Sequence, residues 1–134
     1  MENNSCFKLA LSVRDYECDI QGIVNNAVYQ NYFEHARHEY LKQHGFHFND
    51  LTQSGIFLVM VRAEIHYRRP LRSGDSFQVS VSLKSHTRTR CIFEQSILMG
   101  QNLHADGMFS IAALNNKQKP IKLEDVGLGR LYTE

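Results

Sequence analysis

The residues best suited to chemistry lie just before a helical pattern near the N-terminus. Asp19 belongs to the charged segment 14–22, and Asn25 and Asn26 follow it where the helical spacing of apolar residues begins. An exposed aspartate has a reference pKa of about 3.9, so its carboxylate is ionised at neutral pH and can attack a carbon atom or deprotonate water. The first turn of a helix presents unpaired amides that carry about half a positive charge and can polarise a carbonyl oxygen. The spacing therefore predicts an acid beside amides that could stabilise an oxyanion.

Each of these acids also has a structural interpretation. An aspartate just before a helix is most often a capping or turn residue. Glu17 is a competing carboxylate two residues before Asp19, and Glu34 on the predicted helix is either a second acid or a partner for Arg37 three residues on, which is the interpretation we favour. Cys18 adjoins Asp19, but no histidine lies nearby in the sequence to activate its thiol. We therefore expect Cys18 to be structural.

Two basic segments could bind an anionic partner. The run KSHTRTR contains Lys84, Arg88 and Arg90, and the run YRRPLR, residues 67–72, adds three arginines. Arginine binds phosphate and carboxylate groups in bidentate fashion. The structural alternative is a solvated hairpin end whose charges protect the sheet from aggregation.

The apolar spacing predicts one strand, one long helix and four further strands. Segment 7–13 alternates apolar and polar residues, segment 14–22 is a loop in which Gly22 permits a turn, and residues 26–44 repeat apolar positions every three or four residues before Gly45. Further strands are predicted at 56–69, 76–85, 91–99 and 103–114. Residues 47–54 read as a short irregular connection, and residues 121–134 show no clear pattern.

These elements predict an α+β fold. Short links between strands favour antiparallel neighbours, and one helix must cover the apolar face of the sheet. We expect a single domain over residues 1–134, with the sheet wrapped around a central helix. Tyr29 and Tyr32 are expected in the core, and His35 and His38 at the surface. The polar positions expected to form the wet face of the helix are Gln30, Asn31, Arg37, His38 and Glu39.

Composition excludes several classes of protein. Fifteen Lys and Arg balance fourteen Asp and Glu, giving a formal charge of +1 at pH 7, which argues against a general nucleic-acid binder. The N-terminus has no secretory pattern, and the longest aliphatic run, 56–61, is too short to span a bilayer, so we expect a cytoplasmic protein without a membrane span. Three cysteines without metal-ligand spacing indicate free thiols and no metal site. No phosphate-loop or nucleotide motif is present, so no bound cofactor is expected.

Nine residues carry a family resemblance. They form the pattern D-x-x-G-x-V-x-N-x-x-Y-x-x-Y-F-E-x-x-R, which begins at Asp19 and ends at Arg37, and residues 67–75 form Y-x-x-P-L-x-x-G-D. Both resemble the hotdog-fold thioesterases of the 4-hydroxybenzoyl-CoA thioesterase type. The segment VRDYE-x-D-x-x-G-x-VNNAVY is similar to the corresponding sequence of the acyl-lipid thioesterases of plastids, including the methylketone synthase thioesterase, and of their bacterial relatives.

The resemblance implies a hydrolase that cleaves fatty or related acyl thioesters without a cofactor. It implies a hotdog fold, a five-stranded antiparallel sheet around one long central helix, in a homodimer or homotetramer whose active site lies where subunits meet. Asp19 would be the catalytic nucleophile or general base. The amide of Asn26 would contact the thioester oxygen.

The resemblance also implies a set of substrate contacts. Gly22 and Val24 would lie beside the thioester, and Tyr29, although expected in the core, could line an acyl tunnel. The carrier is either coenzyme A, with its phosphates, or the acidic surface of an acyl carrier protein. The residues proposed to contact it are Lys84, Arg88 and Arg90.

Three rival functions stay open at this point. A hotdog dehydratase or hydratase needs a histidine with a carboxylate for proton transfer, and none lies between residues 13 and 30. A non-catalytic acyl-thioester-binding protein could share the fold, although the presence of Asp19 argues against it. An RNA-binding module is disfavoured by the balanced charge and the absence of interleaved aromatic residues in the basic segments. Acyl chain length and 3-oxo or hydroxyl preference are left open.

Overall fold

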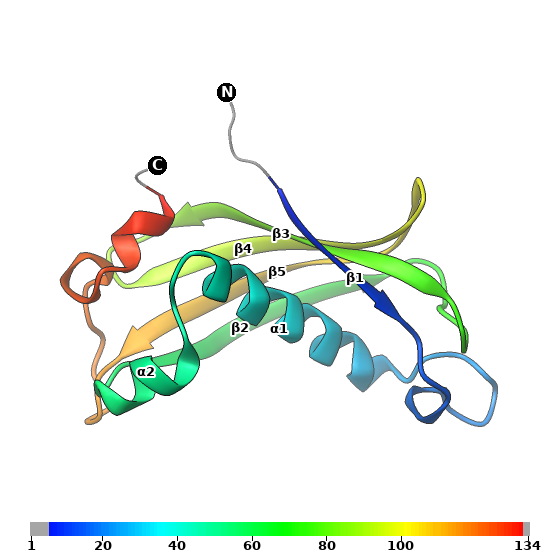
Figure 1. The fold of residues 1–134 in the computed structure, drawn as a ribbon, viewed down its shortest axis with the longest axis horizontal. Coiled ribbons are helices and arrows are strands. Elements are labelled where there is room, and N and C mark those ends of the chain that lie inside the picture. The colour runs from blue at the N-terminus through cyan, green and yellow to red at the C-terminus, as the bar shows by residue number, and fades with distance from the viewer. Residues whose placement is uncertain (1–5, 133–134) are drawn as a thin grey trace.

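An antiparallel sheet of five strands curls around one long helix (Figure 1). The computed structural model describes residues 6–132. The long helix, α1, spans Asn26–Gln43 and lies along one face of the sheet. The predicted α+β sheet and central helix are confirmed. The strands are β1 (Phe7–Ser12), β2 (Phe57–Tyr67), β3 (Ser76–His86), β4 (Arg90–Met99) and β5 (Asn102–Leu114).

The strands follow the order β1-β3-β4-β5-β2, which corrects part of the predicted pairing. Short links do join the antiparallel pairs β3–β4 and β4–β5, but β2 pairs with β5 and not with β3. The link between β2 and β3 crosses beneath the start of α1, because Leu71 is fully buried there and its carbonyl accepts from the amide of Val24 at 2.9 Å. Link length alone therefore predicted the wrong neighbour for β2.

A second helix, α2, spans Phe48–Gln53, where an irregular connection was expected. Six residues form too short a repeat to recognise in the sequence. The helix is held by packing: Leu51 is buried, and the ring of Phe48 lies 4.0 Å from the ring of His38 between centroids. The prediction for residues 47–54 was wrong because tertiary contacts decide the conformation there.

Helix α1 has the predicted length and end signals. The side-chain oxygen of Asn25 accepts from the amide of Ala27 at 2.9 Å, which caps the first turn. Gly45 follows the last turn at a φ of +90°, a left-handed conformation that glycine adopts without strain. The predicted core residues Tyr29 and Tyr32 are both buried.

Arg37 is buried, although it was predicted on the wet face of α1. Its Nη1 donates to Oε1 of Gln95 at 3.0 Å, its guanidinium carbon lies 4.8 Å from the ring centroid of Phe109, and Nε2 of Gln95 donates to the carbonyl of Phe33 at 3.0 Å. Burial lowers the pKa of Arg37 to about 10, and the nearby Glu34 opposes that shift. The side chain is long enough to reach a partner on β4, so Arg37 stays charged inside the core.

Glu34 is the partner of His38 and not of Arg37. Its Oε2 lies 3.6 Å from Nε2 of His38, one helical turn further on. His38 is only half-exposed, because α2 covers one side of its ring, so the predicted surface position is wrong for this histidine. Burial lowers the pKa of His38, and Glu34 partly offsets that effect.

The C-terminal segment closes one end of the core. It forms two short 3-10 turns, Leu123–Val126 and Leu128–Leu131, for which the sequence provided no prediction. Leu123 and Leu128 are each 1% exposed, and the amide of Leu123 donates to the carbonyl of Arg88 at 2.8 Å. The segment is therefore part of the packed structure.

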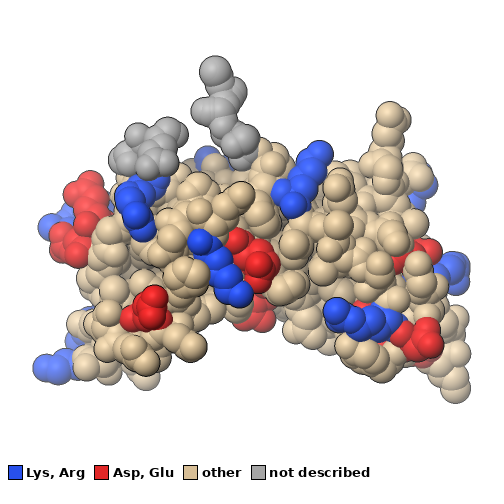
Figure 2. Space-filling model, in the orientation of Figure 1, with Lys and Arg blue, Asp and Glu red and all other residues tan. Residues whose placement is uncertain are grey.

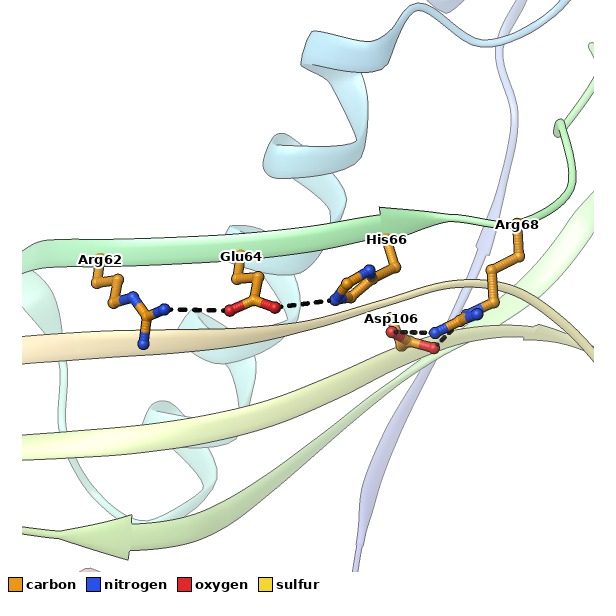
Figure 3. Close-up of polar contacts among 5 residues, drawn as sticks. All are labelled: Arg62, Glu64, His66, Arg68 and Asp106. Atoms are coloured by element: carbon orange, nitrogen blue, oxygen red, sulfur yellow. Dashed lines mark hydrogen bonds and ion pairs between the residues drawn. The ribbon is translucent and has the colours of Figure 1, made fainter.

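A bulge at Val61 sets the two faces of β2. Met60 pairs with Ile111 and Arg62 with Ser110, so Val61 has no partner position in β5. Beyond the bulge, side chains at alternate positions point away from the helix and form the row Arg62, Glu64 and His66, joined at 3.2 and 3.0 Å (Figure 3). The same view shows Arg68 paired with Asp106 at 2.7 Å. The outer face of β2 is thus polar, while its backbone edge has no neighbouring strand within residues 6–132.

The balanced charge is also visible on the surface. Figure 2 shows acidic and basic side chains interspersed on the face displayed, without a large patch of one sign. Among the described residues, no helix combines the length and the apolar character needed to cross a bilayer.

Leu123→Ala is expected to lower the free energy of unfolding by about 2–5 kcal/mol, because it leaves a cavity where the C-terminal segment meets the core. Ile20→Ala is the control, since Ile20 is fully exposed and its truncation should change stability by no more than about 0.5 kcal/mol. Urea unfolding followed by circular dichroism measures both. Equal stabilities for the two variants would show that the segment does not pack as described.

Candidate active site

The loop before α1 is anchored by the buried carboxylate of Glu17. Glu17 ends a 3-10 turn, Asp15–Glu17, and is 8% exposed. Its Oε1 accepts from the hydroxyl of Tyr32 at 2.6 Å and from the amide of Arg14 at 2.9 Å, while Nη1 of Arg14 lies 3.3 Å from Oε2. The backbone carbonyl of Glu17 accepts from the amide of Asn25 at 3.0 Å. Glu17 therefore joins the loop to α1, a role that its sequence position did not reveal.

Asp19 lies in a tight hairpin turn directly after this anchor. Its backbone amide donates to the carbonyl of Ile23 and its carbonyl accepts from the amide of Gly22, both at 2.9 Å. Gly22 has a φ of +83°, which requires a residue that tolerates the left-handed conformation, as the sequence predicted. Oδ1 of Asp19 accepts from the amide of Gln21 at 2.9 Å, and the side chain is exposed. The other carboxylate oxygen has no hydrogen-bond partner within residues 6–132.

The first turn of α1 leaves one amide available. The amide of Ala27 is occupied by the side chain of Asn25, and the amide of Val28 donates to the carbonyl of Asn25. In the described part of the chain, the amide of Asn26 donates to no acceptor, and Asn26 is exposed. This amide lies at the positive end of the helix dipole. It is therefore free to donate a hydrogen bond to an oxygen on which negative charge develops.

Val24 and Tyr29 have structural contacts within this chain. They are 2% and 3% exposed, and both contact Leu71: the hydroxyl of Tyr29 accepts from its amide at 3.2 Å, and Val24 donates to its carbonyl. Burial raises the pKa of Tyr29, so its hydroxyl stays protonated. Their predicted contact with substrate stays a prediction.

Tyr67 lies beside the helix start, and sequence reasoning did not single it out. Its hydroxyl donates to the carbonyl of Asn26 at 3.4 Å, and its ring centroid lies 5.2 Å from that of Tyr29. Tyr67 is nevertheless 48% exposed. The only signal in the sequence was its place in the second family motif.

The predicted basic site is not beside Asp19 in the same chain. Lys84, Arg88 and Arg90 lie at the hairpin between β3 and β4, whereas the first residue of β3 adjoins the loop of Asp19 (Figure 1). An eleven-residue strand of this kind is about 33 Å long. The structure instead brings Arg72 to the site, because Arg72 forms a bridge with Ile23.

An apolar cavity lies between α1 and the sheet, near the C-terminal end of the helix. It is a cavity of about 140 Å³ bounded by α1, α2, the sheet and the C-terminal turns. Its wall contains the thiol of Cys91, whose pKa is raised to about 11 by burial, so this thiol is protonated at neutral pH. The charged residues and the one histidine of its wall all come from α1. The lining residues are Glu34, Arg37, His38, Leu41, Phe48, Leu58, Met60, Cys91, Phe93, Ile111, Leu123, Leu128 and Leu131.

Comparison with known proteins gives a consistent family assignment. The profile of the thioesterase-like superfamily matches residues 13–131. The chloroplastic acyl-acyl carrier protein thioesterase ATL3 of Arabidopsis thaliana is 37% identical over 120 residues, covering 87% of this chain and 62% of that protein. The long-chain acyl-CoA thioesterase FadM of Escherichia coli strain K12 is 31% identical over 118 residues, covering 85% of this chain and 88% of that protein. The chain thus spans less than two thirds of the plastid relative.

Solved structures share the fold. The crystal structure of a probable thioesterase from Bartonella henselae superposes with a TM-score of 0.83 at 28% identity, covering 89% of this chain and 99% of that one. A DHNA-CoA thioesterase from Staphylococcus aureus superposes with a TM-score of 0.86 at 21% identity, covering 91% of this chain and 83% of that one. The second likeness shows the fold alone.

Tyr32→Phe is expected to lower the free energy of unfolding by about 1–3 kcal/mol, because it removes the buried hydrogen-bond donor of Glu17. Burial first, and then the contact with Glu17, raises the pKa of Tyr32. The unfolded chain loses this proton near pH 10 while the folded chain keeps it, so stability falls as pH rises above about 10. Tyr32→Phe should flatten that fall.

Urea unfolding at neutral and alkaline pH measures the effect of Tyr32→Phe. Tyr16→Phe is the matched control, since Tyr16 is 79% exposed. If Tyr32→Phe were as stable as the native protein, with the same dependence of stability on alkaline pH, the hydrogen bond from Tyr32 to Glu17 would not stabilise the fold.

Proposed function

The chain belongs to the thioesterase-like superfamily, and from this premise we propose that it hydrolyses acyl thioesters of coenzyme A or of an acyl carrier protein. One observation carries the proposal: the exposed carboxylate of Asp19 lies in the turn that leads into a helix whose first amide, that of Asn26, has no acceptor within residues 6–132. Acyl transfer needs two such groups: a carboxylate that attacks the acyl carbon or deprotonates water, and a hydrogen-bond donor for the oxyanion. The names of the relatives agree with this chemistry.

The reaction would begin with the thioester oxygen accepting a hydrogen bond from the Asn26 amide. Negative charge that develops on this oxygen is stabilised by the amide and by the helix dipole. If Asp19 acts as a general base, it takes a proton from water as the water oxygen bonds to the acyl carbon. The C–S bond then breaks, and the leaving thiolate receives that proton.

Direct attack by Asp19 is the alternative route to the same products. The carboxylate oxygen would bond to the acyl carbon and expel the thiolate, and water would then hydrolyse the resulting mixed anhydride. In both routes one water is consumed, and one acid and one thiol are released. The exposed position of Asp19 is compatible with either.

A second copy of the chain would complete the site. Among the residues that the structure describes, no strand neighbours the outer edge of β2, and Val59, Val61 and Tyr67 along it are 40, 44 and 48% exposed. Free apolar edges of this length associate with other strands. Antiparallel pairing of β2 with β2 of a second copy would give a homodimer, or half of a homotetramer.

The same pairing would bring the predicted basic residues of one subunit near the Asp19 site of the other. A two-fold axis at the middle of β2 reverses the partner, so the partner's Lys84, Arg88 and Arg90 would lie at the same end of the joined sheet as Asp19. They could then contact the phosphates or the acidic surface of the carrier, together with the nearby Arg72.

Asp19→Asn is expected to lower kcat for acyl-CoA hydrolysis by at least about 10²-fold with little change in KM, because the amide can neither attack nor accept the proton. Thiol release measured on a panel of acyl-CoA and acyl carrier protein thioesters tests this. Asp15→Asn changes a second exposed acid of the same loop and should retain activity within about threefold of native.

Two results would contradict the proposal. Full activity of Asp19→Asn would exclude this mechanism. Absence of hydrolysis by the native protein on the whole panel would instead favour an acyl-thioester-binding protein without catalysis.

Val61→Lys is expected to weaken the dimer on the order of tenfold, because the two-fold axis brings two like charges together in an apolar contact. Sedimentation velocity over a concentration series measures the change. Gln78→Lys, at an exposed position of β3, is the matched control and should leave the dimer intact. Dimers of equal strength in both variants would rule out β2 as the contact.

A further inference from the structure

The 140 Å³ cavity is suited to hydrocarbon. Most of its wall is aliphatic or aromatic. Apart from the protonated thiol of Cys91, its titratable side chains are Glu34, Arg37 and His38, all on α1. All three have partners, since Arg37 donates to Gln95 and Glu34 lies against His38. The rest of the cavity wall therefore offers a ligand only apolar contacts.

The cavity has an open side and a closed side. Met60 lines it and is 36% exposed, so the cavity opens beside the free edge of β2. Leu123 and Leu128 line it as well and are each 1% exposed. The C-terminal turns therefore form its inner end.

A route from Asp19 to the cavity of the same chain is obstructed. The rings of Tyr29 and Tyr67 meet edge to face between α1 and β2, and the hydroxyl of Tyr67 reaches the carbonyl of Asn26. These contacts fill the space between helix and edge strand at the end where Asp19 lies. An extended chain bound at Asp19 has to leave the protomer.

Antiparallel pairing of β2 across a two-fold axis supplies the other route. The central residue of the eleven-residue strand is Arg62, so pairing about this residue places Tyr67 opposite the partner's Phe57. The next residues of the partner's strand lead to Leu58 and Met60, which line its cavity. The helix start of one protomer then adjoins the open side of the partner's cavity.

We propose that the hydrocarbon end of an acyl chain whose thioester lies at Asp19 enters the cavity of the partner subunit, and that Leu128 at the inner end limits its length. The inference rests on the proposed function, since it names the part of the substrate that the cavity binds. Each methylene that the cavity no longer admits loses its burial, which amounts to about fourfold in kcat/KM.

Substitution of Leu128 tests the length limit on straight-chain saturated acyl-CoA thioesters of increasing length. Leu128→Phe should move the optimum to shorter chains, with about a fourfold loss for each methylene beyond it, and Leu128→Ala should move it to longer chains. Leu51→Ala is the matched control, because Leu51 is a buried leucine outside the cavity wall. Unchanged length profiles in both Leu128 variants, with hydrolysis intact, would overturn the inference but not the proposed function.

Mixed dimers test whether the chain crosses to the partner. One subunit carries Asp19→Asn and the other carries Leu128→Phe, and each homodimer alone should fail on long chains. In the mixed dimer, the intact Asp19 of one subunit faces the intact cavity of the other. Recovery of about half of the native long-chain activity supports the crossing, and failure to recover it overturns the crossing.

Labelling of Cys91 gives a readout that does not need catalysis. Palmitate bound in the cavity should slow the reaction of Cys91 with N-ethylmaleimide at least about tenfold, followed by mass spectrometry, while the exposed Cys6 reacts as before. Protection of Cys91 in a protein that hydrolyses no thioester would support the cavity as an acyl site and refute the proposed function. Absence of protection would overturn the cavity as the acyl site.

Discussion

The candidate site depends on the hydrogen bonds of Glu17. Its carboxylate holds Tyr32 of the helix and the amide of Arg14, and its carbonyl holds the amide of Asn25. A buried carboxylate is costly without such donors. These contacts fix the hairpin of Asp19 against the first turn of α1, so the carboxylate and the amide donor keep a defined relation. Catalysis by preorganised groups requires that relation.

The edge of β2 is the second constraint. The bulge at Val61 allows Leu58 and Met60 on one side and Tyr67 on the other to face the helix layer, while Arg62, Glu64 and His66 form a polar outer row (Figure 3). Within residues 6–132, the strand thus presents a solvated face and an unpaired backbone edge, and the cavity opens beside that edge. Pairing of two such edges would connect the acid of one subunit with the apolar cavity of the other, which a single chain cannot do.

Much of the fold was predictable because its signals are local. The alternation in residues 7–13 and the spacing of three and four from Asn26 onward reflect neighbours in the sequence, and Asn25 and Gly45 mark the ends of α1 by their own conformational preferences. Helix α2 and the C-terminal turns were missed because six- and four-residue elements have no repeat to detect. Arg37 was misplaced because a long polar side chain on a helix reads as exposed unless its distant partner, Gln95, is known.

The sequence by itself determined the type and length of the main elements, the position of Asp19 before a helix start, and membership of a thioesterase family. Only the tertiary structure decided that β2 is an edge strand, that Lys84, Arg88 and Arg90 lie far from Asp19 in one chain, and that Leu123 and Leu128 close a cavity. The reason is physical: propensities and caps act over a few residues. Strand order, burial of a charge and the wall of a cavity arise from contacts between residues far apart in the chain.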